Sequence, residues 1–280
     1  MEDNKKKGIT VTEVVEAIEE IAPVSLQESW DNSGLLIGFE DSCVDRLLTC
    51  LEVDMKVVDE AIHLGAGMIV THHPLIFGGI KKLHAGDPDD KAMMKLVSGG
   101  ISVYSCHTPF DKVKGGNNDI IARMLGLTSV RNLKGEPVSA AAKMIERADE
   151  ADIGRMGKLK EAMTCRQVLG LVSAQMDISL RQLRFVGDMD EDITMVGVCT
   201  GAGADLMEMA AASGCQMFIT GDVKYHEARY ALAHGIAVID AGHYGTEKFF
   251  ASAMKEKLEK KLEGVSIAAS KINQEPFTML

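Results

Sequence analysis

The chain lacks several features that would assign it to a class at once. None of its six cysteines forms a C-x-x-C pair, so the sequence indicates neither a zinc knuckle nor a thioredoxin-type redox site. No apolar run is long enough to span a bilayer. The charged start MEDNKKKGIT has no apolar region behind it of the kind that a signal peptide needs. We therefore expect a cytoplasmic protein, in which free thiols persist as small buried hydrophobes.

The composition is that of a globular protein with an excess of acidic residues. Of the 280 residues, 46% are hydrophobic and 25% are charged, so the chain can bury a real core. The length allows one large domain or two smaller ones. The formal net charge of -11 argues against a protein whose main partner is the nucleic acid backbone.

Helix and strand patterns alternate along the chain, which predicts an α/β fold with crossover helices. In the first part, strands are predicted at 45–53, 67–71 and 101–106, and helices at 13–23, 56–66, 89–100 and 117–126. In the last part, strands are predicted at 193–199, 216–221 and 236–240, and helices within 200–214 and at 225–235 and 246–262, before a short final strand.

The middle of the chain is less regular and holds charged, glycine-containing stretches. Within it we predict a helix at 165–176 and a strand at 183–187. The expected organisation is an N-terminal αβ lobe at 1–127, a connector or edge segment at 128–192, and a similar αβ lobe at 193–280 that completes one continuous unit. Both lobes are expected to have mixed sheets.

Four polar clusters occupy equivalent positions, each where a predicted strand ends. They are THHP at 71–74, HTPFD at 107–111, TGDVKYHE at 220–227 and DAGHYGTE at 240–247. In open α/β sheets, ligands bind at the carboxyl ends of strands because the loops there converge. We therefore expect the functional site at these strand ends, between the two lobes.

Three of these clusters carry candidate metal ligands. Adjacent His72 and His73 can face one site only just past a strand end, where the pleat breaks, and Pro74 supports that position. His243 and Glu247 are spaced i, i+4, so they share one face of a helix that starts at about Tyr244. The alternative for His72 and His73 is a pair of surface or hydrogen-bonded histidines. The alternative for His243 and Glu247 is a capped helix with a solvated glutamate.

Asp111 supplies a carboxylate that can bridge two ions. The alternative interpretation is that Asp111 is an aspartate of a turn. Together with the histidines and Glu247 it makes a mixed nitrogen and oxygen set, which suits zinc, iron, manganese, cobalt or nickel rather than calcium or copper(I). His107 and His226 are candidates for orienting a ligand or transferring a proton. Structural histidines bonded to the backbone are the alternative for these two.

The sequence allows two interpretations of several other polar residues. The TGAGAD segment at 200–205 offers backbone N–H groups for a phosphate, or it is a plain tight turn. Asp31 and Asn32 either line the same sheet edge or cap a turn. Trp30 is expected to be packed rather than functional.

These motifs resemble the Nif-three-like proteins, a dinuclear-metal-centre family whose members are often named GTP cyclohydrolase 1 type 2 homologues. The resemblance is carried by SWDNSGLLIG, THHPLIF, HTPFD, ITGDVKYHEA, DAGHYGTE and the terminal INQEPF, in the family's order over nearly the whole chain. It departs from the family at HTPFD, where HTNLD is usual, so Pro109 and Phe110 change the loop that carries Asp111.

The resemblance implies two divalent ions per subunit, held by His72, His73, Asp111, His243 and Glu247, with the two carboxylates suited to bridging. It also implies a ring-shaped homohexamer, a trimer of dimers, and the short form of the family without an inserted domain. The expected function is a metal-dependent hydrolase acting on a small-molecule nucleotide or phosphoester. The alternatives are a metal-binding scaffold or metal-handling protein without turnover, and a regulatory partner-binding protein.

Overall fold

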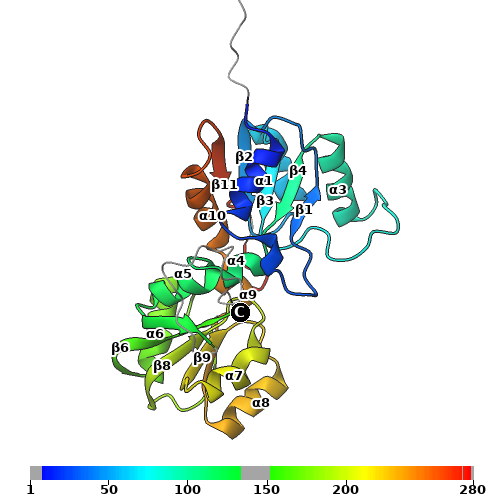
Figure 1. Cartoon of the computed structure of the whole chain (residues 1–280). Helices are drawn as coiled ribbons and strands as arrows, with labels where there is room; N and C mark the ends of the chain where they lie inside the picture. Colours follow the sequence, from blue (N-terminus) through cyan, green and yellow to red (C-terminus); the bar gives the residue numbers. More distant parts are fainter. Residues whose placement is uncertain (1–7, 134–151, 273, 279–280) are drawn as a thin grey trace, which may run out of the picture. The chain divides into compact units, whose positions relative to one another are not determined.

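The computed structural model describes residues 8–133, 152–272 and 274–278. The remaining positions are 1–7, 134–151, 273 and 279–280, so the predicted connector and the INQEPF string lie partly outside the described residues. The chain divides into two compact units (Figure 1). Unit 1 comprises 1–110 and 250–274, and unit 2 comprises 111–249 and 275–280.

Unit 1 is built on a five-stranded mixed sheet in the order β1-β4-β3-β2-β11. Strands β2 (Arg46–Cys50), β3 (Met68–Thr71), β4 (Ser102–Ser105) and β11 (Ser266–Ala269) are parallel, and β1 (Gly34–Ile37) pairs antiparallel with β4. Strands β2, β3 and β4 are largely buried, as expected for strands covered on both faces.

The strand register assigns the helices of unit 1 to opposite faces of its sheet. Leu48, Ile69 and Val103 align across β2, β3 and β4 and share a core with α2 (Met55–Leu64) and α3 (Pro88–Ser98). The next aligned row points to the other face because side chains alternate along a strand. There Thr49 donates to Ala251 O in α10 (Phe250–Glu259), and Tyr104 donates to Glu19 in α1 (Val11–Glu19).

Helices α1 and α2 in unit 1 begin at residues that commonly cap helices. Thr10 caps α1 in a capping box with Glu13, and Asp54 caps α2 through Val57 N. Helix α2 ends at Gly65 in the left-handed region, where glycine carries no steric cost. A single turn of 3-10 helix, η1 (Val24–Leu26), follows Pro23.

Unit 2 is built on a six-stranded mixed sheet in the order β5-β6-β8-β9-β10-β7. Strands β8 (Asp192–Val198), β9 (Met217–Thr220) and β10 (Ala237–Asp240) are parallel. Strands β5 (Thr128–Asn132), β6 (Arg155–Thr164) and β7 (Arg184–Val186) are joined to the sheet by antiparallel pairing.

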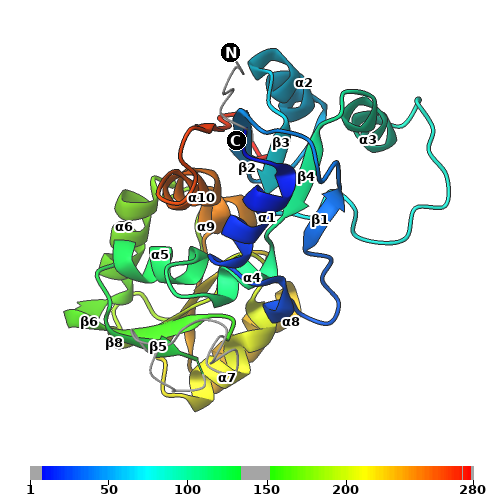
Figure 2. The ribbon, with the colours of Figure 1, turned by 45° about the horizontal axis from the view of Figure 1, so that its top comes forward.

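Helices cover both faces of the unit 2 sheet (Figure 2). Helices α5 (Asn117–Met124) and α6 (Cys165–Met176) pack against Ile219 and Ile239. Helices α7 (Met207–Ala212) and α8 (Tyr225–His234) pack against Phe218 and Val238 on the other face. The 3-10 turn η3 (Ala204–Leu206) leads into α7, and the short helices α4 (Thr108–Lys112) and α9 (His243–Glu247) carry candidate site residues.

The predicted fold class, two αβ lobes with mixed sheets, is confirmed. The predicted boundaries at 127/128 and 192/193 do not coincide with the limits of the compact units, because α10 and β11 return to the unit 1 sheet. The predicted helix at 246–262 is wrong in detail: it is interrupted between α9 and α10. In the described part of the chain, no helix combines the length and apolarity needed to cross a membrane.

Candidate metal centre

Three histidines gather at the carboxyl ends of β3 and β4 in unit 1. Strand β3 ends at Thr71, so His72 and His73 lie just past it, as predicted. Their ring centroids are 5.2 Å apart, and the ring of His107, which follows β4, lies 5.1 Å and 5.8 Å from them. One nitrogen of each of the three rings lies within 4.8 Å of the others. This spacing suits nitrogens that bind one ion or two neighbouring ions.

The main chain fixes the imidazole of His72. Its Nδ1 lies 3.0 Å from Cys106 O, and a carbonyl can only accept, so Nδ1 carries the proton and Nε2 carries the lone pair. His72 is fully buried. The backbone ladder continues beyond the strand end, since His72 N and His73 N donate to Cys50 O and Leu51 O. A neutral histidine protonated at Nδ1 is a form that can bind a metal ion through Nε2.

Asp31 fixes the orientation of the His107 ring in a similar way. Its Oδ1 lies 2.8 Å from Nδ1 of His107, and the Asp31 side chain is fully buried. Burial alone would raise the pKa of Asp31, but hydrogen bonds from His107 and Thr108 outweigh it. The charge of His107 and a hydrogen bond from Ser33 add to this, and the pKa is held well below its usual range. Asp31 is thus a buried carboxylate anion that orients a ring.

In unit 2, Asp111 lies in α4 and is held by polar side chains from two other segments. Its Oδ1 accepts from Asn117 Nδ2 at 2.9 Å and from Thr200 Oγ1 at 3.3 Å. Asn118 donates to Asp111 O at 3.0 Å and accepts from Thr200 N at 2.9 Å. These contacts fix the carboxylate, which is only 4% exposed. Pro109 and Phe110 leave Asp111 on a helical turn, so the altered motif retains a positioned carboxylate.

Helix α9 places the other two donors of unit 2 on one face. It starts at His243 rather than Tyr244, and His243 Nε2 lies 3.0 Å from Glu247 Oε2. Two donor atoms that bind the same ion at about 2.1 Å lie about 3.0–3.4 Å from each other for ordinary coordination angles. Glu247 is 2% exposed, and oxygens of Glu247 and Asp111 lie within 4.8 Å of each other. The donor set of unit 2 therefore fits a divalent ion.

The glycines of unit 2 explain how the backbone approaches these donors so closely. A Cβ on Gly201, whose φ is +68°, would lie 2.3 Å from Glu247 Oε1. A Cβ on Gly221 would lie 2.6 Å from His243 N. The glycine turn at 200–205, for which a phosphate cradle was one interpretation, therefore has a structural role: its backbone lies against the Glu247 carboxylate.

Asp222 orients His243, and the sequence did not single it out. Its Oδ2 lies 2.8 Å from His243 Nδ1, which directs Nε2 toward Glu247. Asp222 adopts a φ of +55°, an uncommon conformation for a residue other than glycine. A carboxylate behind a metal-binding histidine fixes the ring and raises its basicity. The only signal in the sequence was its place in the TGDVKYHE cluster.

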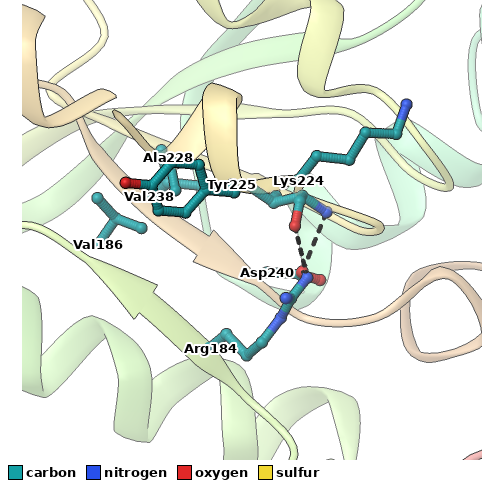
Figure 3. A pocket seen from close by; sticks show the side chains of 8 residues that line it. Arg184, Val186, Lys224, Tyr225, Ala228, Val238 and Asp240 are labelled. Carbon is teal, nitrogen blue, oxygen red and sulfur yellow. Dashed lines mark hydrogen bonds and ion pairs between the residues drawn. The ribbon is translucent and has the colours of Figure 1, made fainter. Parts of the chain in front are cut away.

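The loop that carries Asp222 borders a cavity of ≈ 310 Å³, whose lining side chains are drawn in Figure 3. Asp240, at the end of β10, lies in its wall and accepts from Arg184, Val223 N and Gly242 N. Since Val223 follows Asp222 and Gly242 precedes His243, one carboxylate anchors both partners of the Asp222–His243 contact. Lys224 and Tyr225 line the same cavity.

The other predicted residues have simpler surroundings. His226 is exposed on the first turn of α8, with its ring 5.5 Å from Tyr225. Its role in proton transfer stays a prediction. Trp30, expected to be packed, is 57% exposed, so that expectation is wrong. Five of the six thiols are buried, and Cys43 is exposed. Burial and nearby carboxylates raise the pKa of Cys199 well above its usual value, as expected for an inert buried thiol.

Fold and site together define an α/β protein of two units that presents nitrogen and carboxylate donors suited to divalent metal ions. The family model described as Duf34/NIF3 (NGG1p interacting factor 3) matches residues 9–276, and the chain belongs to this family. The resemblance drawn from its motifs is confirmed.

Two relatives match this chain over nearly their whole length. A GTP cyclohydrolase 1 type 2 homolog of Clostridium acetobutylicum is 37% identical over 260 residues, covering 93% of each chain. One of Clostridium perfringens is 31% identical over 271 residues, covering 96% of this chain and 99% of that one. The crystal structure of a Bacillus cereus protein related to NIF3 superposes with a TM-score of 0.88 at 25% identity, covering 98% of this chain and 100% of that one.

Proposed function

We propose that the protein is a metal-dependent hydrolase that binds two divalent ions and acts on a nucleotide or another phosphoester. The observation that carries this proposal is the buried pair of Asp111 and Glu247, whose oxygens lie within 4.8 Å of each other beside His243. At this distance two carboxylate charges repel each other by about 3 kcal/mol for an effective dielectric constant of about 20. A bound cation offsets that repulsion.

We propose further that His72 and His73 bind the same pair of ions as Asp111, His243 and Glu247. Each donor set is prepared by its own unit, since His72 and His243 are oriented by Cys106 O and Asp222. Mixed nitrogen and oxygen sets suit zinc, iron, manganese, cobalt or nickel.

The test is metal content per chain in His72→Ala and Glu247→Gln, measured by elemental analysis after dialysis. A shared centre predicts that each substitution weakens retention of both ions. Loss of one ion in each variant, with full retention of the other, would show two separate sites.

When bound, a pair of divalent ions supplies Lewis-acid activation of water and of the scissile bond. The chain's own residues supply proton transfer and positioning. His107 is held through Nδ1 by Asp31, so its Nε2 is the atom that accepts a proton from water or returns one to the leaving group. His226 is the second candidate for this step. The substrate that the relatives' name suggests is GTP, and simpler phosphoesters suit the same donors.

The activity is tested with protein reloaded with manganese, zinc or iron and offered GTP and p-nitrophenyl phosphate. We expect metal-dependent turnover that Asp111→Ala abolishes. Asp190→Ala is the matched control, because Asp190 is an exposed carboxylate whose ion pair is with the exposed Arg166. Turnover that is absent with every metal, or equal in the two variants, removes the hydrolase proposal.

We also propose a cytoplasmic homohexamer, a trimer of dimers, as the family resemblance implies. Light scattering after size-exclusion chromatography, with and without chelator, measures the assembly. If chelation dissociates the oligomer and no substrate turns over, the donors serve assembly or metal handling, and the scaffold alternative replaces the hydrolase.

A further inference from the structure

An exposed aromatic pair stands next to the histidines of unit 1. Trp30 and Phe77 are each 57% exposed, and their rings stack with centroids 6.2 Å apart and an interplanar angle of 26°. Trp30 is the only tryptophan in a chain with just 5% aromatic residues. Large aromatic side chains left in water side by side mark binding surfaces more often than isolated exposed residues do.

The pair is held in place by the loops that carry it. Asn32 Nδ2 donates to Ile76 O at 2.6 Å, which ties the loop after Trp30 to the residue before Phe77. Asp31, the neighbour of Trp30, is anchored by Ser33 Oγ at 2.8 Å and by Thr108 N at 3.2 Å. The two rings are therefore displayed by a cross-linked pair of loops.

Both rings also contact His107. The His107 ring lies 5.8 Å from Trp30 and 6.5 Å from Phe77, at 77° and 74° to them. His107 in turn lies 5.1 Å from His72. A planar molecule stacked on the aromatic pair would thus lie about one ring width from the imidazoles. Flat aromatic surfaces bind planar rings without regard to their substituents, whereas a bare phosphate gains nothing from them.

We propose that Trp30 and Phe77 form the stacking surface for the planar ring of the substrate. This rests on the proposed function, and it makes the substrate a ring-bearing molecule such as a nucleotide rather than a bare phosphoester. Trp30 and Phe77 hold the ring, and His107 lies at its edge. The stacked occupant is a small molecule. A second copy of the chain, seated on Trp30 and Phe77 and on the exposed Ile80 and Leu83 that follow Phe77 in the sequence, is the other outcome that the test distinguishes.

The single tryptophan makes the test direct, because its fluorescence reports the proposed surface alone. Metal-free protein is titrated with GMP, AMP and ribose 5-phosphate, with excitation at the red edge of the tryptophan band, where purines do not absorb. We expect saturable quenching by GMP and AMP and none by ribose 5-phosphate. Because no metal is present, binding is measured without turnover, so its result is separate from that of the hydrolase assay.

Two phenylalanine variants are compared in the same titration. Phe77→Leu is expected to raise the Kd for GMP about tenfold. Phe277→Leu, which removes another exposed phenylalanine, in unit 2, is expected to leave the Kd for GMP unchanged. Equilibrium dialysis of Trp30→Leu with GMP extends the comparison to Trp30 and is expected to show a similar rise.

The proposal is overturned by quenching by ribose 5-phosphate equal to that by GMP, by no quenching with either purine nucleotide, or by an unchanged Kd in Phe77→Leu. Fluorescence that changes with protein concentration in the absence of nucleotide would assign the surface to a second copy instead. GTP turnover whose KM is the same in Trp30→Leu would leave the hydrolase standing and remove the stacking surface.

Discussion

Replacing Gly201 by alanine places a methyl group where the Glu247 carboxylate lies. The added Cβ would be 2.3 Å from Glu247 Oε1 and 3.4 Å from His243 Nε2. Ordinary contact requires about 3.5 Å, so the carboxylate oxygen must move by about 1 Å. Metal–oxygen bonds tolerate deviations of only about 0.2 Å. We therefore expect Gly201→Ala to lower metal affinity at least about tenfold.

The same substitution has a second effect that must be separated from the first. Gly201 has a φ of +68°, where alanine costs about 1–2 kcal/mol of stability. Gly214→Ala is the matched control, because Gly214 has a φ of +88° and a Cβ there meets no atom within 4 Å. Both variants should lose similar stability in urea unfolding, and only Gly201→Ala should lose metal.

The assay is competition for zinc or manganese with a chromophoric chelator, on protein that is folded by circular dichroism. Equal metal affinity in Gly201→Ala and Gly214→Ala would refute the reasoning, because it would mean that the position of Glu247 does not matter to the ion. A loss of affinity in both variants would refute it too, since backbone strain would then be the cause.

Further predictions concern the groups around the donors. Asp222→Asn should weaken metal binding about tenfold by releasing the His243 ring, while exposed Asp190→Asn should not, and equal chelator competition in both would contradict the orienting role. Arg155→Met should lower the free energy of unfolding by about 3–5 kcal/mol, measured in urea, because it leaves Asp119 and the carbonyls of Lys112 and Val113 without their buried partner. Chelation should lower the Tm, and manganese at 100 times its Kd should restore about 2.7 kcal/mol, so a Tm that ignores both treatments would disprove metal binding to the folded state.

The sequence predicted the regular elements of the sheets well, because buried parallel strands read as short apolar runs. The predicted strand at 67–71 and the helix at 165–176 correspond closely to β3 and α6. Strand β6 was missed, since its pairing with β8 shifts register between Lys158 and Met163 and its buried residues do not alternate. The break between α9 and α10 was also missed, because an apolar periodicity can continue across a turn.

The candidate donors were visible in the sequence, but the groups that orient them were only partly so. His72, His73, Asp111, His243 and Glu247 stand out as clusters at strand ends. Asp222 binds a ring 21 positions away along the chain, a contact that only the fold creates. The exposure of Trp30 was equally hidden, since the local sequence pattern does not indicate it.

The return of β11 to the edge of β2 has a consequence for how the chain folds during synthesis. The ribosome releases residues 111–249, nearly all of unit 2, before it makes α10 and β11. Until Ser266–Ala269 emerge, β2 is an open sheet edge that lacks its last parallel neighbour. Unit 2 can therefore fold before the sheet of unit 1 is complete. A truncated nascent chain that ends before residue 266 should expose the unpaired edge of β2 and bind chaperones or aggregate.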